Sequence, residues 1–379
     1  MKSKKNSDSI SANAMAATSH PLATEEALNI LKKGGNAVDA AIAASICLSV
    51  VEPNSTGIGG DCFAIVKMEN KDPISYNGSG IAPKKANFEF FESKNIDKIE
   101  LTTPHSVTIP GALDAWKTIH DEHGKLDFEE LFLNSINYAE NGYKVTKKVS
   151  EAWEKSFKKL NSHKITKNLY LKHGKVYKNN ELRKNIPLAN TLKLIKKNGI
   201  KEFYQGSIAE DMVESLNEIG GLHSIEDFSI QKTLRSKTIS SNLKDMTVHQ
   251  CPPNGPGVTV LLMLKLLEKL KINKFNPDSV ERFHLEAEVT KLCYKIREEN
   301  IADPNYISID LEKILSEQNI QELFDNISLN KCYKINDLKI PNHPETVYLT
   351  VVDKDLNSVS IINSICYSFG SGITSNKSG

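Results

Sequence analysis

The sequence lacks the features that mark several common classes of protein. Its six cysteines include no C-x-x-C pair, so neither a zinc ribbon nor a disulfide framework is indicated. Forty-eight Lys and Arg residues stand against 47 Asp and Glu, and a net charge of +1 leaves no bulk charge to hold nucleic acid or an anionic membrane. With 39% hydrophobic and 25% charged residues, the composition is that of a globular protein and not a disordered one.

No long hydrophobic run opens the chain. Residues 1–11 are basic and polar and no apolar segment follows them, so a secretory signal is not supported. The apolar stretch 37–51 contains Asp39 and is too short to span a bilayer. We therefore expect a cytoplasmic protein with free thiols, and a loose tail over residues 1–14.

Several motif-like segments fail on their spacing. The Gly-rich segment 57–60 lacks the spacing of a phosphate or dinucleotide loop and is interpreted as a tight turn with close backbone approach. Residues 353–357 (DKDLN) begin like a calcium loop, but the sixth and twelfth positions are both serine. His284-x-Glu286 has no P-C-x-x-C partner and is interpreted as part of a structural helix. No metal site is expected, and without a G-x-S-x-G elbow an α/β-hydrolase is unsupported.

Helical patterns dominate the first 300 residues. Thr24 is predicted to cap a helix that ends at Gly34-Gly35, and Asn36 to cap a second helix over 37–50 that is apolar on nearly every face. A strand is predicted over 62–67 after the Gly-rich turn. Further helices are predicted over 126–141, 208–219, 258–270 and 278–299.

The periodicity of the hydrophobic residues changes from helical to strand-like near residue 346. Residues 346–352 (TVYLTVV) alternate between polar and apolar, and 358–365 is a second β-rich run after a short polar turn. Together they predict a β-hairpin, with Thr346, Tyr348 and Thr350 on one face and Val347, Leu349 and Val351 on the other. Buried helices with a strand-rich end favour a layered α/β protein.

Thr346 is an ordinary strand residue unless the chain is cut before it. A chain-terminal Thr carries its own general base, because an α-amino group has a pKa near 8 and is partly neutral at pH 7. That amine can take the Oγ1 proton as the hydroxyl attacks an amide. The same Oγ1 could first attack the Glu345–Thr346 peptide bond, giving an ester that water resolves. One atom would then serve both activation and catalysis.

Short segments from residue 15 onward match one family pattern in order. They are 15–25 (MAATSHPLATE), 34–43 (GGNAVDAAIA), 51–60 (VEPNSTGIGG), 109–112 (IPGA), 203–206 (FYQG), 220–222 (GGL), 252–257 (PPNGPG), 302–304 (ADP) and 345–353 with Phe369-Gly370. On these segments the chain resembles the γ-glutamyltransferase (γ-glutamyltranspeptidase) family of N-terminal-nucleophile hydrolases. The resemblance implies an α+β fold, a four-layer αββα sandwich in one structural domain. It also implies a precursor that is processed into a large subunit, 15–345, and a small subunit that starts at 346–379.

The resemblance also implies an activity and its site. Thr346 matches the nucleophile, and Glu345–Thr346 matches the cleavage site. The family attacks a γ-glutamyl amide such as that of glutathione, forms an acyl-enzyme, and passes the acyl group to water or an amino-acid acceptor. No metal or organic cofactor and no nucleic-acid or membrane partner is implied.

Three positions near the site depart from the family pattern. Ser79 stands where the family has an Arg that binds the glutamate carboxylate, and a neutral serine cannot form that bidentate pair. Ser364 matches a supporting Thr and keeps its hydroxyl, whereas Cys366 matches an Asn and bonds more weakly. The nucleophile is thus expected within an altered pocket. An acylase for a different amide, for example of the glutaryl type, is the alternative.

The chain stops at Gly379, whereas the small subunit of the family continues further. The remaining part would supply an acidic residue for the substrate amine and a Gly-Gly pair whose N–H groups form the oxyanion hole. Losing one such donor costs on the order of 10²–10³ in rate. We therefore expect the C-terminal part of the sandwich to be missing, and an incomplete, inactive fragment remains a third hypothesis.

Overall fold

The computed structural model describes residue 11, residues 13–334 and residues 346–379. Within these ranges the chain forms two compact units, where we expected one domain. Of the described residues, the first unit comprises 11, 13–72, 76–234 and 346–379, and the second comprises 73–75 and 235–334. The predicted tail over 1–14 lies mostly outside the described residues, and Glu345 lies wholly outside them.

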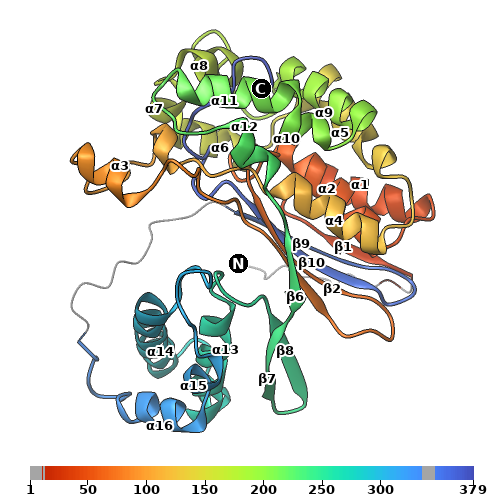
Figure 1. Cartoon of the computed structure of the whole chain (residues 1–379). Helices are drawn as coiled ribbons and strands as arrows, with labels where there is room; N and C mark the ends of the chain where they lie inside the picture. The colour runs from red at the N-terminus through yellow and green to blue at the C-terminus, as the bar shows by residue number, and fades with distance from the viewer. Residues whose placement is uncertain (1–10, 12, 335–345) are drawn as a thin grey trace. The chain divides into compact units, whose positions relative to one another are not determined.

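A sheet with its last two strands at its centre organises the first unit (Figure 1). Its strands follow the order β1 (Met15–Ala17), β9 (Thr346–Val352), β10 (Ser358–Ser364), β2 (Asp61–Lys67) and β3 (Ile74–Gly78), and β6 (Leu234–Lys237) begins at the last residue of this unit before the second unit starts. The pairs β1/β9, β9/β10 and β10/β2 are antiparallel. The predicted strand at 346–352 is confirmed at both ends, while the strands predicted at 358–365 and 62–67 differ by one residue.

One face of this sheet is buried under helices. Val347, Leu349 and Val351 are fully buried, while Thr346 and Tyr348 of the same strand are exposed, so the predicted alternation is confirmed. Helix α2 (Ala37–Val51) packs on the buried side of β9 and β10. Figure 1 shows α1, α2 and α4 together on that side of the sheet. The nucleophile candidate therefore points away from the helical layer.

Helix α2 is buried along its whole length, because its small side chains allow neighbours to approach from every side. Asn36 caps it as predicted: its Oδ1 accepts the N–H groups of Val38 and Asp39 at 2.9 and 3.1 Å. The Asp39 carboxylate in turn accepts the Asn36 N–H at 2.9 Å, which completes a capping box. The helix runs one residue beyond the predicted end.

Helix α1 (Pro21–Lys32) begins before the predicted cap, so the cap at Thr24 is wrong. His20 is the cap instead, and its Nδ1 accepts the Leu22 N–H at 3.2 Å. Pro21 suits the first turn because no N–H donor is needed there. The Thr24 hydroxyl bonds the Thr18 hydroxyl at 2.8 Å from inside the helix.

The rest of the first unit is largely helical. The helix predicted over 126–141 divides into η2 (Phe128–Phe132) and α5 (Leu133–Asn141), and that over 208–219 is α11 (Ser207–Asn217). A short ribbon joins β4 (Tyr143–Lys144) to β5 (Leu182–Arg183). The other helices are α3 (Phe88–Ser93), η1 (Pro104–Ser106), α4 (Ala112–His123), α6 (Lys147–Lys155), α7 (Phe157–Leu160), α8 (Lys164–Tyr170), α9 (Ile186–Asn198), α10 (Lys201–Gln205) and α12 (Ile225–Ser229).

The turn between β9 and β10 is the predicted hairpin turn. The Asp353 N–H donates to the Asn357 carbonyl at 3.1 Å. Asp353 Oδ1 accepts the N–H groups of Asp355 and Asn357 at 2.9 and 3.0 Å. Asp353 Oδ2 accepts the N–H of Ala37, the first residue of α2, at 2.9 Å. One carboxylate therefore shapes the turn and joins it to the positive end of the helix.

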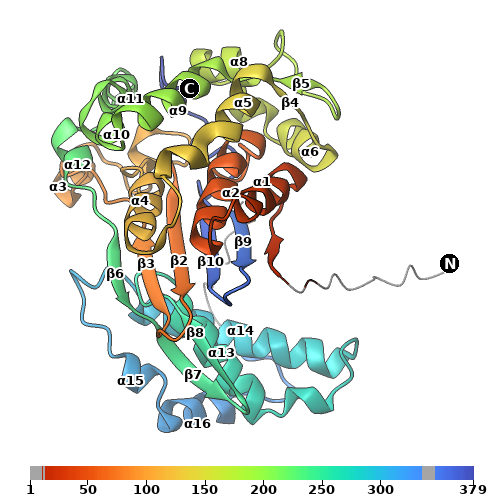
Figure 2. The same cartoon turned by 90° about the vertical axis from the view of Figure 1, so that its right-hand side faces the viewer.

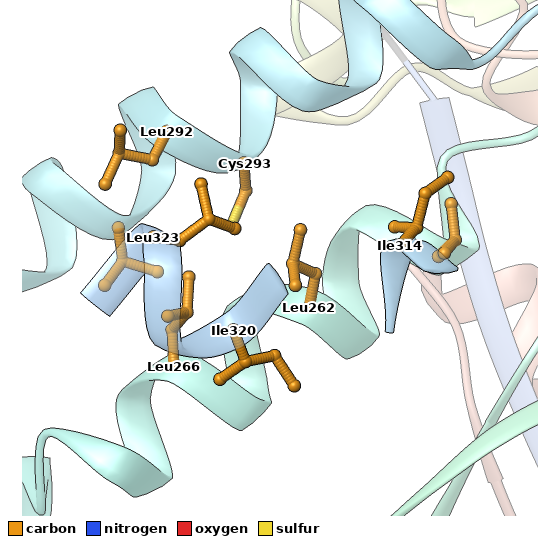
Figure 3. Packing of buried hydrophobic residues seen from close by; sticks show 9 residues of the cluster. Leu262, Leu266, Leu292, Cys293, Ile314, Ile320 and Leu323 are labelled. Carbon is orange, nitrogen blue, oxygen red and sulfur yellow. The ribbon is translucent and has the colours of Figure 1, made fainter. Parts of the chain in front are cut away.

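The second unit has a separate helical core (Figure 3). The helices α13 (Gly257–Lys269), α14 (Val280–Asn300), α15 (Leu311–Ile314) and α16 (Glu317–Asp325) bury a cluster that includes Leu262, Leu266 and Cys293. The helices predicted over 258–270 and 278–299 are confirmed to within two residues. The second unit also contains a ribbon of β7 (Ile239–Leu243) and β8 (Met246–Gln250), which Figure 2 shows from another side, and the short helix η3 (Ile272–Lys274). None of the helices in the described ranges has the length and apolarity that crossing a membrane requires.

Candidate active site

Thr346 and Ser364 lie side by side at one end of the hairpin. They are register partners at the start of β9 and the end of β10, so their side chains leave the same face of the sheet. Thr346 Oγ1 and Ser364 Oγ are 3.0 Å apart, and Ser364 Oγ accepts the Cys366 N–H at 2.8 Å. The structure thus brings three of the residues singled out in the sequence to one place. Thr346 is exposed there and open to a substrate.

The Gly-rich turn 57–60 brings β2 close to this pair. A Cβ atom at Gly60 would lie 2.2 Å from the Ser364 carbonyl oxygen, so only glycine fits. The Gly60 carbonyl accepts the N–H groups of Gly111 and Ala112 at 3.0 and 2.9 Å. The interpretation as a tight turn with close backbone approach is confirmed.

Ser79 lies just beyond the end of β3. Its hydroxyl donates to Asn77 Oδ1 at 2.8 Å, and its N–H donates to the same oxygen at 3.0 Å. Its carbonyl accepts from Gln231 Nε2 at 3.4 Å. The hydroxyl is thus part of a local turn, and the position carries no positive charge.

Cys366 follows β10 in a left-handed conformation, with φ of +70°. Asn tolerates that region better than Cys does, since its short polar side chain bonds locally. Desolvation raises the pKa of the thiol, the negative charge of Asp61 raises it further, and Lys159 lowers it. Cys366 is therefore a neutral thiol, a weak hydrogen-bonding group beside the two hydroxyls.

Asp61 is a site residue that the sequence reasoning missed. It opens β2 and is the register partner of Ser364, which is itself the partner of Thr346. The Gly80 N–H donates to its Oδ1 at 2.9 Å, and burial raises its pKa to about 6. The only signal in the sequence was an acidic residue at the start of an apolar strand. The pairing of β2 with β10 could not be read from the sequence.

Lys159 supplies a positive charge near the loop that follows β10. Its Nζ donates to the carbonyl oxygens of Ser368 and Gly370 at 2.7 and 2.8 Å. Burial lowers its pKa, and Cys366 partly offsets that effect. Its main contacts hold the loop in shape.

A possible metal-binding group lies in the second unit, where His284, Glu288 and Cys332 come together. Its carboxylate is already engaged: Glu288 pairs with Lys291 at 2.5 Å and accepts the Tyr333 N–H at 2.7 Å. We therefore assign it no role. His284 Nε2 donates to the Ser328 carbonyl oxygen at 2.7 Å, consistent with a structural helix.

Comparisons with known proteins point to one family. The family model described as gamma-glutamyltranspeptidase matches residues 23–379. A "Glutathione hydrolase-like YwrD proenzyme" of Bacillus subtilis is 32% identical over 99% of this chain and 71% of that protein. A "Glutathione hydrolase proenzyme" of Escherichia coli is 27% identical over 96% of this chain and 65% of that protein. The chain thus spans about two thirds of the length of these relatives.

A solved structure gives the same result for the fold. The crystal structure of a cephalosporin acylase from Bacillus halodurans superposes with a TM-score of 0.87 at 30% identity. The superposition covers 97% of this chain and 68% of the acylase. A mixed α/β fold with an antiparallel sheet is therefore shared with this cephalosporin acylase.

Proposed function

Because the chain belongs to the gamma-glutamyltranspeptidase family, we propose that it is made as a precursor and cut between Glu345 and Thr346. Thr346 Oγ1 attacks the carbonyl carbon of residue 345, the C–N bond breaks, and the freed amine becomes the α-amino group of Thr346. Water then hydrolyses the ester, which releases the carboxylate of residue 345 and restores the hydroxyl.

The processed Thr346 then acts as an amidohydrolase nucleophile. Its neutral α-amine takes the Oγ1 proton as Oγ1 attacks a γ-glutamyl amide such as that of glutathione. The amine leaving group departs with a proton, and an acyl ester remains on Thr346. Water or an amino-acid amine takes the acyl group in the second step. No metal enters any of these steps.

The observation that carries this proposal is the pair of hydroxyls 3.0 Å apart on an exposed sheet face. Ser364 Oγ takes one hydrogen bond from the Cys366 N–H, which orients it toward Thr346. Thr346 begins its strand and its hydroxyl is held by a second hydroxyl. Cleavage of the peptide bond before residue 346 would give it an α-amino group as general base.

The finer features of the fold belong to the same proposal. We place the sheet in a four-layer αββα sandwich, in which a second sheet covers the face bearing Thr346. The contrast between the buried and exposed faces of β9 supports this arrangement. We also propose a cytoplasmic enzyme whose large and small subunits come from one precursor.

The acylase likeness supports one alternative, a hydrolase of another amide such as a glutaryl amide. Ser79, in a place where the family has a guanidinium that binds the glutamate carboxylate, weakens standard γ-glutamyl recognition and motivates that alternative. An incomplete and inactive chain is the remaining possibility. Two experiments distinguish the γ-glutamyl hydrolase, the acylase for another amide and the inactive chain.

Mass spectrometry of the expressed chain tests the first step. We expect two pieces, residues 1–345 and 346–379, and an uncut chain for Thr346→Ala. Thr346→Ser should still be cut, because it keeps the hydroxyl. A wild-type chain that stays whole after folding would refute the precursor mechanism.

Release of aniline from γ-glutamyl and glutaryl anilides tests the second step. A preference for the γ-glutamyl compound supports the main proposal, and a preference for the glutaryl compound supports the alternative. A folded, cut chain that turns over neither would support the inactive fragment.

A further inference from the structure

We propose that Asp61 determines the acyl donor, by binding an ammonium group that lies three or four bonds from the scissile carbonyl. This inference rests on the proposed function and adds the class of substrate to it. Asp61 thereby becomes a specificity-determining residue of the site, beside the nucleophile and its supporting serine.

Strand register places Asp61 within reach of a bound acyl group. Asp61, Ser364 and Thr346 are consecutive partners across β2, β10 and β9. Paired residues project from the same face, and strands lie about 4.8 Å apart, so the Cα atoms of Asp61 and Thr346 are roughly 10 Å apart. All three side chains therefore border one patch of the sheet surface.

The span between the two outer side chains fits a short acyl group. A reacting carbonyl carbon lies about 3 Å from the nucleophile oxygen, and a charge-assisted N–H···O bond is about 2.8 Å long. Roughly 4 Å then remains between the carbonyl carbon and the nitrogen. Bonds of about 1.5 Å cover that distance in three or four steps.

No positively charged side chain among the described residues pairs with Asp61. Among the described residues its carboxylate makes one hydrogen bond, to the Gly80 N–H, and no ion pair. The ammonium group of Lys159 donates instead to the Ser368 and Gly370 carbonyls. Burial without a counter-charge raises the pKa of Asp61 to about 6. A cationic ligand would supply the missing charge.

Asp61 also selects against donors that carry a carboxylate without an amine. Ser79 adds no positive charge, and its hydroxyl donates to Asn77 Oδ1. A glutaryl group would bring a second carboxylate toward Asp61, and like charges repel strongly in a partly buried site. The geometry therefore favours an amine-bearing acyl group over a dicarboxylic one.

Four anilides test the inference on the full chain: γ-glutamyl, glutaryl, 4-aminobutyryl and butyryl. For wild type we expect kcat/KM for the 4-aminobutyryl compound to exceed that for the butyryl compound at least tenfold, mainly through KM. Asp61→Asn should reduce this ratio to within twofold of one, and Asp61→Glu should keep part of it. Asp355→Asn, a charge removed from the hairpin turn, is the matched control and should change nothing.

The ratio of two donors is independent of how much enzyme is processed. An unchanged ratio in Asp61→Asn would overturn the inference and leave the proposed function standing. A wild-type chain that is not cut and turns over no anilide would refute the proposed function, and the inference with it.

If Asp61→Asn does not fold, a measurement on the wild-type protein tests whether Asp61 binds the ammonium group of the donor. The 4-aminobutyryl to butyryl ratio should fall several-fold as the pH is lowered through about 6, where Asp61 gains its proton. Ionisation of the Thr346 amine affects both donors alike and cancels in the ratio. Cys366 and Tyr204, whose charges interact with that of Asp61, both have a raised pKa and so do not titrate near pH 6, and a flat ratio would contradict the proposal.

Discussion

The side-chain carbonyl of Asn363 accepts a hydrogen bond from Trp116 Nε1 at 3.0 Å, on the buried face of the sheet. Asn363 Nδ2 donates to Ser45 Oγ of α2 at 3.0 Å, and Ser45 Oγ donates to the Ala41 carbonyl at 2.8 Å. This chain of polar contacts ties β10 to helices α4 and α2 directly beneath Ser364. Buried polar groups with all partners present specify one arrangement of packed layers.

Replacing Asn363 by Ala should destabilise the first unit by about 2–4 kcal/mol, since Trp116 Nε1 loses its acceptor and a small cavity forms. Urea unfolding followed by tryptophan fluorescence measures the change. Ile362→Thr, on the exposed face of the same strand, is the control and should cost less than 1 kcal/mol. A cost for Asn363→Ala no larger than for the control would show that the network contributes little.

Removing the hydroxyl of Ser364 should slow chemistry without unfolding the protein. Ser364→Ala leaves Thr346 Oγ1 without its neighbour at 3.0 Å, and we expect the rates of precursor cleavage and anilide turnover to fall roughly 10–100-fold. Ser364→Thr keeps the hydroxyl and should stay within a few-fold of wild type. Gel densitometry over time gives the rate of precursor cleavage. Equal rates for Ser364→Ala and Ser364→Thr would show that the Ser364 hydroxyl does not assist Thr346.

Asp353 should matter far more than its neighbour Asp355. Asp353→Ala removes four acceptor contacts, including the bond to the Ala37 N–H, and should cost about 2–4 kcal/mol. Asp355→Ala changes an exposed side chain of the same turn and should be nearly neutral. Matching midpoints of thermal unfolding for the two variants would contradict this view of the turn.

Asp61 should lower stability at neutral pH. Its pKa is about 6 in the folded protein against 3.8 for the ordinary carboxyl, so the folded state holds the proton more tightly. The free energy of unfolding therefore falls as pH rises from about 4 to 6 and stays lower above that window. About two pKa units correspond to at most about 3 kcal/mol.

Asp61→Asn carries no charge, so it should be more stable than wild type above pH 7 by about 1–3 kcal/mol and equal to it near pH 4. Urea unfolding of both proteins at several pH values measures the difference. Asp355→Asn, the matched control, should show no such window. A stability difference that does not change with pH would mean that Asp61 is ionised without cost in the folded state.

Local patterns predicted the hairpin well, because its signals are short-range. Alternation fixed which side of β9 carries Thr346, and the Asn36 cap fixed where α2 starts. The cap at Thr24 is wrong because His20 and Pro21 form an equally local start signal three to four residues earlier. The position of a helix cap therefore depends on all residues of the first turn and not on one favourable side chain.

The residues that meet at the site depend on pairing between strands that are distant in sequence, which no local pattern reveals. Thr346, Ser364 and Cys366 came from resemblance, and the hairpin brought the first two together. Asp61 comes from a strand nearly 300 residues away in sequence, and only the β2/β10 register places it beside Ser364. The division into two compact units likewise depends on contacts between distant segments.

The strand order also determines when the sheet can form during translation. Strands β1 and β2 leave the ribosome within the first 67 residues, yet the two strands that belong between them are residues 346–364. Until those arrive, the nascent chain carries two unpaired strand edges and an apolar helix, α2, without its sheet partners. Such surfaces bind chaperones or aggregate. Translation of the last strands therefore completes the sheet and delivers the nucleophile in the same step.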